Sequence, residues 1–471
     1  MQTRTDTIVA VATAPGRAAI AVVRLSGGDA VAIGRRLVTP FPERARAAVL
    51  AAIHGPGPGA DVIDHGVVTW YAAPHSYTGE DVVELAVHGG ALVSALVMEA
   101  CVTAGARLAL AGEFTERAVL HGKMDLVQAE AVADLIDARS RAAHRAAVRQ
   151  LDGALSVRLA ALREALLQVD ALIAYDIDFP DEDHGAIPRD RVIAACDDAM
   201  AQVERLLATL PAAALGRDGA LVVLAGPPNS GKSSLLNALV GERRVIVSEV
   251  PGTTRDAVEV LVDDTPFPLR LVDTAGLRES GDALERLGIE VSLRYVASAH
   301  VVLACAETAE SLASVVDGMR GMSSGVVLGV LTKADIRGSS TRRHGGKAES
   351  AETATDGGTA TSTAHEGRVS VSAVSGEGLD VLRAAIRAAV EQQVMVTDDT
   401  PLVTRARHAA ALQRAGEELR AFRGAWAAGA LPAPVAATHL RGAVTALEEL
   451  IGAVDVEDVL ERVFRTFCVG K

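Results

Sequence analysis

Residues 226–233 read Gly226-Pro227-Pro228-Asn229-Ser230-Gly231-Lys232-Ser233 and match the pattern G-x-x-x-x-G-K-[ST]. The apolar run 221–225 comes directly before them and predicts a buried parallel strand, and residues 234–239 predict a helix. In this context the pattern binds phosphate, because backbone N–H groups and the positive end of the helix surround the anion. The stretch therefore predicts a nucleotide-binding α/β domain. The alternative, a glycine turn with a chance lysine, is less favoured.

Two further segments supply groups for a nucleotide and its metal ion. In the loop itself, Lys232 is expected to reach the β- and γ-phosphates and the Ser233 hydroxyl to bind Mg²⁺. Asp273-Thr274-Ala275-Gly276 ends a predicted strand, where the Asp273 carboxylate can hold Mg²⁺ through water and the Gly276 N–H can meet the γ-phosphate. The spacing predicts a triphosphate site.

The base is expected to be guanine. Thr332-Lys333-Ala334-Asp335 follows the predicted strand 326–331. Asp335 can accept hydrogen bonds from guanine N1–H and the exocyclic amine, a donor pair that adenine lacks, and the Lys333 stem can lie along the base. Ser372, Ala373 and Val374 follow another short strand and can offer a backbone N–H to the guanine oxygen. Four such segments in this order indicate a Ras-like GTP-binding domain.

Two departures from the Ras-like pattern matter. Thr332 occupies the position of the usual Asn of N-K-x-D, and we expect it to tie its loop to the phosphate loop, with guanine selectivity retained and affinity lowered. No glutamine follows Gly276, since Leu277 and Arg278 come next. That apolar residue, together with Asn229, indicates a monovalent cation that supplies the charge an arginine finger gives elsewhere.

Composition limits the function classes. The chain has 471 residues, a net charge of −14, and four scattered cysteines. The charge argues against electrostatic coating of nucleic acid, and the cysteine spacing against zinc or a disulfide framework. No stretch reaches the ~18 uninterrupted apolar residues of a membrane span, so a cytoplasmic protein without a membrane partner is expected. Only five of the 46 basic residues are lysines, namely Lys123, Lys232, Lys333, Lys347 and Lys471.

The pattern along the chain predicts a multidomain α/β architecture. Short strands within residues 1–120 and a helix over 91–104 predict an α+β domain, and helical periodicity covers 125–175, 189–210 and most of 402–467. The predicted domains are 1–122, a helical first half 123–217, a GTPase domain 218–385 inserted between the helical halves, and a helical second half 386–471. Residues 338–367 predict a low-complexity surface loop.

The whole chain resembles the MnmE (TrmE) family of tRNA modification GTPases. The resemblance lies in Ser76-Tyr77-Thr78-Gly79-Glu80-Asp81, His88-Gly89-Gly90, Gly112-Glu113-Phe114-Thr115, Ile177-Asp178-Phe179-Pro180, Gly252-Thr253-Thr254-Arg255-Asp256 and the terminal Cys468-Val469-Gly470-Lys471. It implies GTP hydrolysis that drives installation of a carboxymethylaminomethyl group at carbon 5 of the tRNA wobble uridine. It also implies a homodimer, a heterotetramer with the FAD-binding partner MnmG, and a one-carbon unit on 5-formyltetrahydrofolate or a related tetrahydrofolate.

The resemblance also implies site residues. The folate site maps to Arg24, Glu84, Lys123 and Lys471, and it requires the terminus to fold back onto the N-terminal domain, expected across a dimer. K⁺ maps to Asn229, the backbone at Ser248 and Val250, and Thr253; Mg²⁺ maps to Ser233 and Thr254. Glu285 would orient the attacking water, and two GTPase domains would pair when K⁺ and GTP are bound. The full GTP site is then expected to comprise five segments. They are Asn229, Ser230, Gly231, Lys232, Ser233 and Ser234; Ser248, Glu249, Val250, Pro251, Gly252, Thr253 and Thr254; Asp273, Thr274, Ala275 and Gly276; Thr332, Lys333 and Asp335; and Ser372, Ala373 and Val374.

Three questions stay open from the sequence. Cys468 is the candidate reactive thiol, against the alternative of a small buried apolar residue. Arg141, Arg145 and Arg149 follow helical spacing and could touch tRNA phosphate, although such a stripe is more often a solvated face. Two rival functions are a regulatory GTPase switch of the ribosome-assembly type and a folate-binding scaffold with a decayed GTPase domain, for which Thr332 is the best support.

Overall fold

The structure is a computed structural model that describes residues 6–57, 59–178, 189–241, 258–264, 266–274, 292–336, 368–393, 401–429, 432–452, 463–464 and 467–470. The chain divides into two compact units: residues 1–136, 150–201 and 410–471 form one, and residues 137–149 and 202–409 form the other. Most of the second unit is thus inserted in the sequence between parts of the first. The finer boundaries at 122, 217 and 385 remain predictions.

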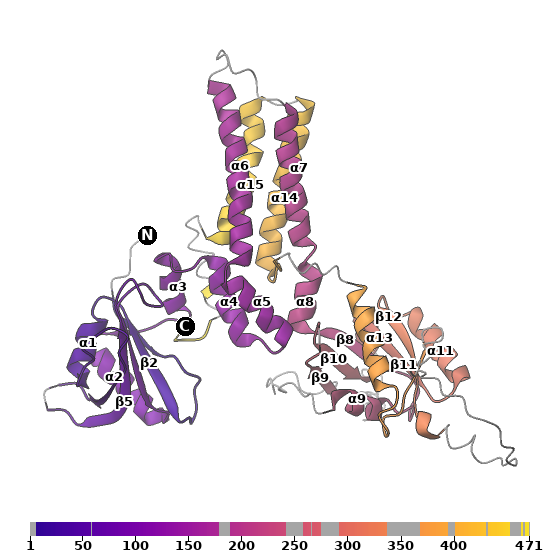
Figure 1. The fold of residues 1–471 in the computed structure, drawn as a ribbon, viewed down its shortest axis with the longest axis horizontal. Helices are drawn as coiled ribbons and strands as arrows, with labels where there is room; N and C mark the ends of the chain where they lie inside the picture. The colour runs from indigo at the N-terminus through magenta and orange to yellow at the C-terminus, as the bar shows by residue number, and fades with distance from the viewer. Residues whose placement is uncertain are drawn as a thin grey trace, which may run out of the picture. The chain divides into compact units, whose positions relative to one another are not determined.

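The first unit begins with a seven-stranded sheet in the order β3-β4-β5-β6-β2-β1-β7 (Figure 1). Its strands are β1 (Ile8–Val11), β2 (Ile20–Ser26), β3 (Val38–Thr39), β4 (Val49–His54), β5 (Val62–Tyr71), β6 (Val82–His88) and β7 (Arg107–Leu108). Helices α1 (Ala30–Leu37) and α2 (Ala91–Thr103) share a buried apolar core with one face of this sheet. The other face carries alternate residues, among them Arg24 and Glu84, which lie opposite each other on β2 and β6.

Helices make up the rest of the first unit. Their bounds are α3 (Glu113–Leu120), α4 (Leu126–Asp137), α5 (Arg141–Leu151), α6 (Ala154–Asp178), α7 (Arg189–Leu207), α14 (Ala406–Ala428) and α15 (Ala433–Ile451). Most of α5 and one end each of α4, α7 and α14 belong to the second unit. Long-range ion pairs join α6 to α15 through Arg163 and Glu448, and α7 to α14 through Asp197 and Arg423. Segments far apart in sequence therefore lie side by side, as Figure 1 shows. None of the described helices is long and apolar enough to cross a membrane.

The second unit is built on a six-stranded sheet in the order β13-β12-β11-β8-β10-β9. The strands are β8 (Ala220–Ala225), β9 (Val258–Val262), β10 (Leu269–Asp273), β11 (Val301–Ala306), β12 (Val326–Leu331) and β13 (Arg368–Ser370), and only β9 is antiparallel to its neighbour. The accompanying helices are α8 (Leu210–Asp218), α9 (Lys232–Val240), α11 (Ala309–Arg320) and α13 (Leu379–Glu391). Every residue of β8 is buried, because a parallel strand in the middle of such a sheet is covered on both faces.

Most strands and helices expected from the sequence are present within a few residues. The sequence analysis named no separate element at α1, α3, α8, α11, α13, β4, β9 or β11, or at the two-residue strands β3 and β7. The C-terminus was expected to fold back onto an N-terminal domain across a dimer. In the structure Val469 pairs with Ala111 of the same chain, so the tail reaches the N-terminal domain without a second chain. Phe464 and Phe467 are buried against Leu126 and Ala129, so apolar packing holds the tail on α4 next to the contact that Val469 makes with Ala111.

Candidate functional site

The carboxyl ends of the parallel strands β8, β10, β12 and β13 meet at one edge of the second sheet. The predicted phosphate loop follows β8, Asp273 ends β10, Thr332 follows β12, and Ser372 lies just beyond β13. Ligands bind outside this edge in open α/β sheets. The four segments that the sequence analysis selected therefore share one edge.

The phosphate loop has the backbone that the motif requires. Gly226 has φ +149°, and a Cβ built on it would lie 2.2 Å from the Cys305 carbonyl oxygen, so no other residue fits. Asn229 has φ +60° and is exposed. The buried Lys232 side chain lies over the loop and donates hydrogen bonds to the carbonyl oxygens of Gly226 at 3.1 Å and Pro227 at 2.7 Å. Its ammonium group thus lies within the loop that would surround phosphate.

A pair of hard oxygen donors lies beside the loop. Ser233, in the first turn of α9, donates a hydrogen bond from its hydroxyl to Asp273 Oδ2 at 2.5 Å. Mg²⁺ prefers a serine hydroxyl and a carboxylate among protein ligands, directly or through water. The donor set therefore fits Mg²⁺ in the roles that the sequence suggested.

Thr332 makes the contact expected of the missing asparagine. Its hydroxyl is buried and donates to the Ser230 carbonyl oxygen at 2.7 Å, with the Ala306 carbonyl oxygen at 3.3 Å. This bond joins the loop after β12 to the phosphate loop. We call the loops after β12 and β13, which carry Asp335 and Ser372, the base-side loops. Asp335 is exposed and accepts a hydrogen bond from the Ser372 hydroxyl at 2.8 Å, so two base-side loops are also joined to each other.

Sequence reasoning missed Glu307, which follows β11 and forms an ion pair with Lys333. Lys333 has φ +57°, an uncommon conformation for lysine, and the N–H of the next residue, Ala334, donates to the Val371 carbonyl oxygen at 3.1 Å. The pair directs the lysine toward β11. Only the three-dimensional neighbourhood reveals it, because Glu307 belongs to none of the nucleotide motifs.

Eleven of the predicted site residues lie outside the described residues. They are Ser248, Glu249, Val250, Pro251, Gly252, Thr253, Thr254, Ala275, Gly276, Glu285 and Lys471. Their assignments remain predictions. The backbone N–H of Ala373 has no hydrogen-bond partner among the described residues. The N–H of the exposed Val374 donates to the Ser372 hydroxyl.

The predicted folate residues Arg24 and Glu84 lie together in the first unit. The Arg24 guanidinium approaches Glu84 Oε1 at 2.8 Å and lies 5.5 Å from the ring centre of Tyr77 and 5.8 Å from that of Phe114. Tyr71 donates to the other oxygen of Glu84 at 3.4 Å, and burial and the Glu84 charge both raise the pKa of Tyr71. Charged groups surrounded by aromatic rings suit a flat ligand with polar edges.

Lys123 and the C-terminal tail approach the same domain. Lys123 Nζ donates to the Pro74 carbonyl oxygen at 3.0 Å, and Lys123 Cδ lies against Gly79. The Gly112 N–H donates to the Cys468 carbonyl oxygen at 3.3 Å, and a Cβ on Gly470 would lie 2.3 Å from the Val11 carbonyl oxygen. The close approach explains the glycine in the terminal motif, and it places the residue before Lys471 on the N-terminal domain.

The cysteines differ in accessibility. Cys468 is exposed, whereas Cys101, Cys196 and Cys305 are buried. Burial raises the pKa of Cys305, which lies beneath the phosphate loop, to about 12, so its thiol is unreactive. The alternative reading of Cys468 as a buried apolar residue is therefore wrong. Among the described residues there is no group of three metal-binding side chains.

A buried ionic network was not anticipated from the sequence. Arg117 of α3 is 3% exposed and binds Glu80 at 3.0 Å, Asp6 at 2.9 Å and Glu113 at 3.0 Å. Arg107 adds bonds to Glu113 at 2.6 Å and to Asp6 at 2.7 Å. The network joins the start of the chain to α3 and to the loop before β6, so it supports the domain that carries Arg24 and Glu84.

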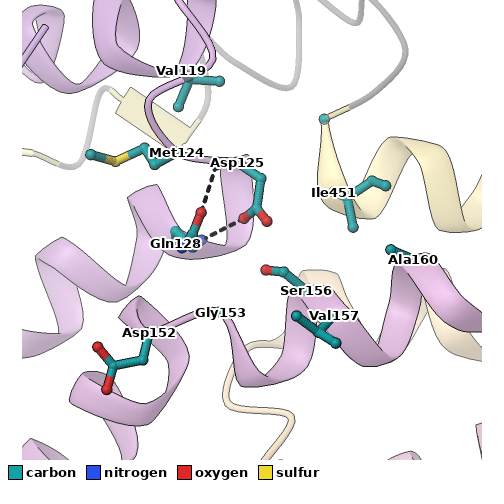
Figure 2. A pocket seen from close by; sticks show the side chains of 11 residues that line it. Val119, Met124, Asp125, Gln128, Asp152, Gly153, Ser156, Val157, Ala160 and Ile451 are labelled. Atoms are coloured by element: carbon teal, nitrogen blue, oxygen red, sulfur yellow. Dashed lines mark hydrogen bonds between the residues drawn. The ribbon is translucent and has the colours of Figure 1, made fainter.

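A cavity of about 540 Å³ lies elsewhere in the first unit (Figure 2). It is lined by Val119, Met124, Asp125, Gln128, Asp152, Gly153, Ser156, Val157, Ala160, Ile451 and Gly452, none of which is a predicted site residue. Asp125 and Gln128 exchange hydrogen bonds with each other's backbone N–H groups at 2.8 and 3.0 Å, as Figure 2 shows. This reciprocal arrangement caps α4, so these two polar groups of the cavity are used in helix capping.

The strand order, the phosphate loop and the base-side loops define a P-loop GTPase. The family model described as "MnmE helical domain" matches residues 126–468, and that described as "GTP-binding protein TrmE N-terminus" matches residues 7–123. The chain belongs to the MnmE (TrmE) family.

Individual relatives agree with the family models. A protein from Moorella thermoacetica named "tRNA modification GTPase MnmE" is 39% identical, with 99% of each chain covered, and one of the same name from Methylobacterium radiotolerans is 42% identical over 99% of each. Among solved structures, the G domain of the T. maritima FeoB iron transporter is 24% identical, covers 36% of this chain and 98% of its own, and has a TM-score of 0.25. A TM-score this low carries no argument, so the fold class is assigned from the strand order of this chain.

Proposed function

We propose that this GTPase drives modification of tRNA at carbon 5 of the wobble uridine, adding a carboxymethylaminomethyl group. The supporting observation is that one chain of this family has two candidate sites: a phosphate loop linked by Thr332 to the base-side loops, and an Arg24–Glu84 pair among aromatic rings in the N-terminal domain. A regulatory switch of the ribosome-assembly type would need the first site only.

In the nucleotide site, Lys232 and the loop N–H groups hold the phosphates, and Asp335 with the Ala373 N–H recognises guanine. Ser233 and Thr254 hold Mg²⁺ beside Asp273, and the hard-oxygen character of Ser233 and Asp273 supports this assignment. When bound, Mg²⁺ neutralises charge on the β- and γ-phosphates. Glu285 orients the attacking water, a role that the family resemblance alone supports.

K⁺ is proposed to bind Asn229, the backbone of Ser248 and Val250, and Thr253. The exposed position and left-handed backbone of Asn229 in the phosphate loop support its part of this site. When bound, K⁺ supplies positive charge near the phosphates, in a chain that has no Ras-type glutamine after Gly276. Two GTPase domains then pair across their nucleotides.

In the N-terminal domain, 5-formyltetrahydrofolate or a related tetrahydrofolate binds near Arg24, Glu84 and Lys123, with Lys471 completing the site. The aromatic surroundings of Arg24 and the tail contact through Val469 and Gly470 support this placement. The exposed Cys468 is the candidate reactive thiol. The protein acts in the cytoplasm as a homodimer, in a heterotetramer with the FAD-binding partner MnmG.

The test is nucleoside analysis of tRNA from cells that lack the protein, complemented with wild type, Lys232→Ala or Glu84→Gln. Wild type should restore the modified wobble uridine, and neither variant should. Restoration by Lys232→Ala would support the folate-scaffold alternative. Restoration by Glu84→Gln would remove the proposed folate site, and failure of wild type would overturn the proposal as a whole.

A further inference from the structure

Helix α5 carries a row of basic side chains, Arg141, His144, Arg145 and Arg149, which we call the α5 stripe. All four are exposed, and their spacing of three and four residues places them on one face of the helix. The helix has no acidic residue. Such a row is notable in a chain whose net charge is −14.

The orientation of this face is fixed by the residues around it. The Ser140 hydroxyl accepts a hydrogen bond from the Ala143 N–H and donates to the Gly216 carbonyl oxygen, both at 3.0 Å. Arg141 pairs with Asp263 at 3.3 Å, and Ala147 is buried on the opposite side of the helix. The stripe therefore points outward on a helix that is held at its N-terminal end.

The side chains of Arg145 and Arg149 have no hydrogen bond or ion pair with any described residue. Many other arginines of the chain pair with carboxylates, as Arg117, Arg163 and Arg423 do. Two neighbouring guanidinium groups without a carboxylate repel each other slightly, which costs stability. An anion bound from outside would relieve this repulsion.

We propose that the α5 stripe binds the phosphate backbone of the tRNA substrate; this rests on the tRNA function proposed above. Guanidinium groups bind phosphate oxygens through paired N–H donors, and residues four apart present two of them side by side. Three of its four side chains are charged, and charged residues are depleted at the centre of protein–protein interfaces. Its composition therefore fits a nucleic-acid backbone rather than an acidic protein surface.

The experiment compares wild type, R145Q/R149Q and a control, R191Q/R205Q, in filter binding of purified tRNA over a range of salt concentrations. Arg191 and Arg205 are exposed on α7, which also carries Asp190, Asp197, Asp198 and Glu204. R145Q/R149Q should bind roughly tenfold more weakly at low salt, with a salt slope smaller by about two. The control should bind like wild type, and both variants should hydrolyse GTP without tRNA at the wild-type rate.

Three results would overturn the inference. Equal tRNA affinity of R145Q/R149Q and wild type would overturn it and leave the proposed function intact, and so would equal weakening in the control, which would reflect net charge alone. Unchanged tRNA affinity with lost binding to the flavoprotein partner would assign the stripe to a protein. A wild type that binds no tRNA would overturn the α5 stripe as a binding surface, whereas the proposed function would fall only if wild type failed to restore the modified uridine in cells.

Discussion

At the scale of single residues, Thr332 shows how one hydroxyl can replace a larger amide. A threonine hydroxyl has one proton, and it goes to the Ser230 carbonyl oxygen at 2.7 Å. An asparagine amide would have two protons to donate. The loop connection is thus retained with fewer hydrogen bonds, which agrees with retained guanine selectivity and lowered affinity.

Thr332→Val should weaken GDP binding by about tenfold. Valine has nearly the same shape but leaves the buried Ser230 carbonyl without its donor, at a cost of about 1 kcal/mol or more. Fluorescence titration with a labelled GDP measures the change. Thr332→Ser keeps the hydroxyl and serves as the control, so wild-type affinity in Thr332→Val would show that the hydrogen bond is unimportant for the nucleotide.

Glu285→Ala should bind GTP normally but hydrolyse it at least about 100-fold more slowly, because a residue that orients water acts only in the transition state. Single-turnover hydrolysis and GTP titration separate the two effects. Glu290→Ala, five residues further along the chain, is the matched control and should be unaffected. If both variants turn over at the wild-type rate, Glu285 has no such role.

At the scale of elements, α3 depends on the ionic network around Arg117. Burial would raise the pKa of Glu113, but hydrogen bonds from Arg107, the Leu110 N–H and Arg117 outweigh it and lower that pKa. The hydrogen bond from Arg107 likewise lowers the pKa of Asp6. Carboxylates with lowered pKa values in the folded protein stabilise it above their ordinary pKa of about 4, and this stabilisation disappears as the pH falls through the lowered values.

The N-terminal domain of wild type should therefore lose stability as the pH falls below about 5, and Arg117→Leu should lose less. At neutral pH the variant should already be less stable by about 3–5 kcal/mol, because it leaves carboxylates buried with one partner fewer. Urea unfolding followed by Trp70 fluorescence in a Trp426→Phe background reports on this domain alone, since the chain has two tryptophans. Arg117→Lys is the control that keeps the charge. An identical pH dependence in Arg117→Leu and wild type would contradict the role of the network.

At the scale of the whole molecule, GTP turnover should require K⁺ and be much slower in Na⁺ at equal ionic strength. The proposed cation site joins Asn229 to residues 248–253, and a smaller ion would fit those ligands poorly. Steady-state hydrolysis in the two salts is the measurement. Asn229→Ala should abolish the difference between the salts, and equal wild-type rates in both would disprove the cation site.

Deletion of Lys471 should weaken binding of 5-formyltetrahydrofolate by about tenfold and leave GTP hydrolysis intact. The tail already lies on the N-terminal domain through Val469 and Gly470, so the loss would be that of one cation beside the folate glutamate rather than of the fold. Calorimetry measures the affinity. Lys347→Ala, which removes a lysine from the low-complexity segment, is the control, and undiminished folate binding without Lys471 would refute the assignment.

Much of this protein could be read from its sequence because the decisive motifs are local. The phosphate loop, its strand and its helix are consecutive in the chain, so hydrophobic pattern and glycine placement were enough to predict them. Four of the five lysines, namely Lys123, Lys232, Lys333 and Lys471, fall at predicted sites in an arginine-rich chain. The short α1, α3 and β4 escaped prediction because tertiary packing, and not local periodicity, stabilises them.

Other features were decided only by the tertiary structure, since they join residues far apart in sequence. Glu307 meets Lys333 because β11 and β12 are neighbours, and Arg24 meets Glu84 because β2 and β6 pair in register. The Arg117 network and the return of the tail to Ala111 arise in the same way. The sequence by itself determined which chemistry is present, through residue types at fixed spacing. Folding determined which groups face each other, because hydrogen bonds and ion pairs depend on distance in space.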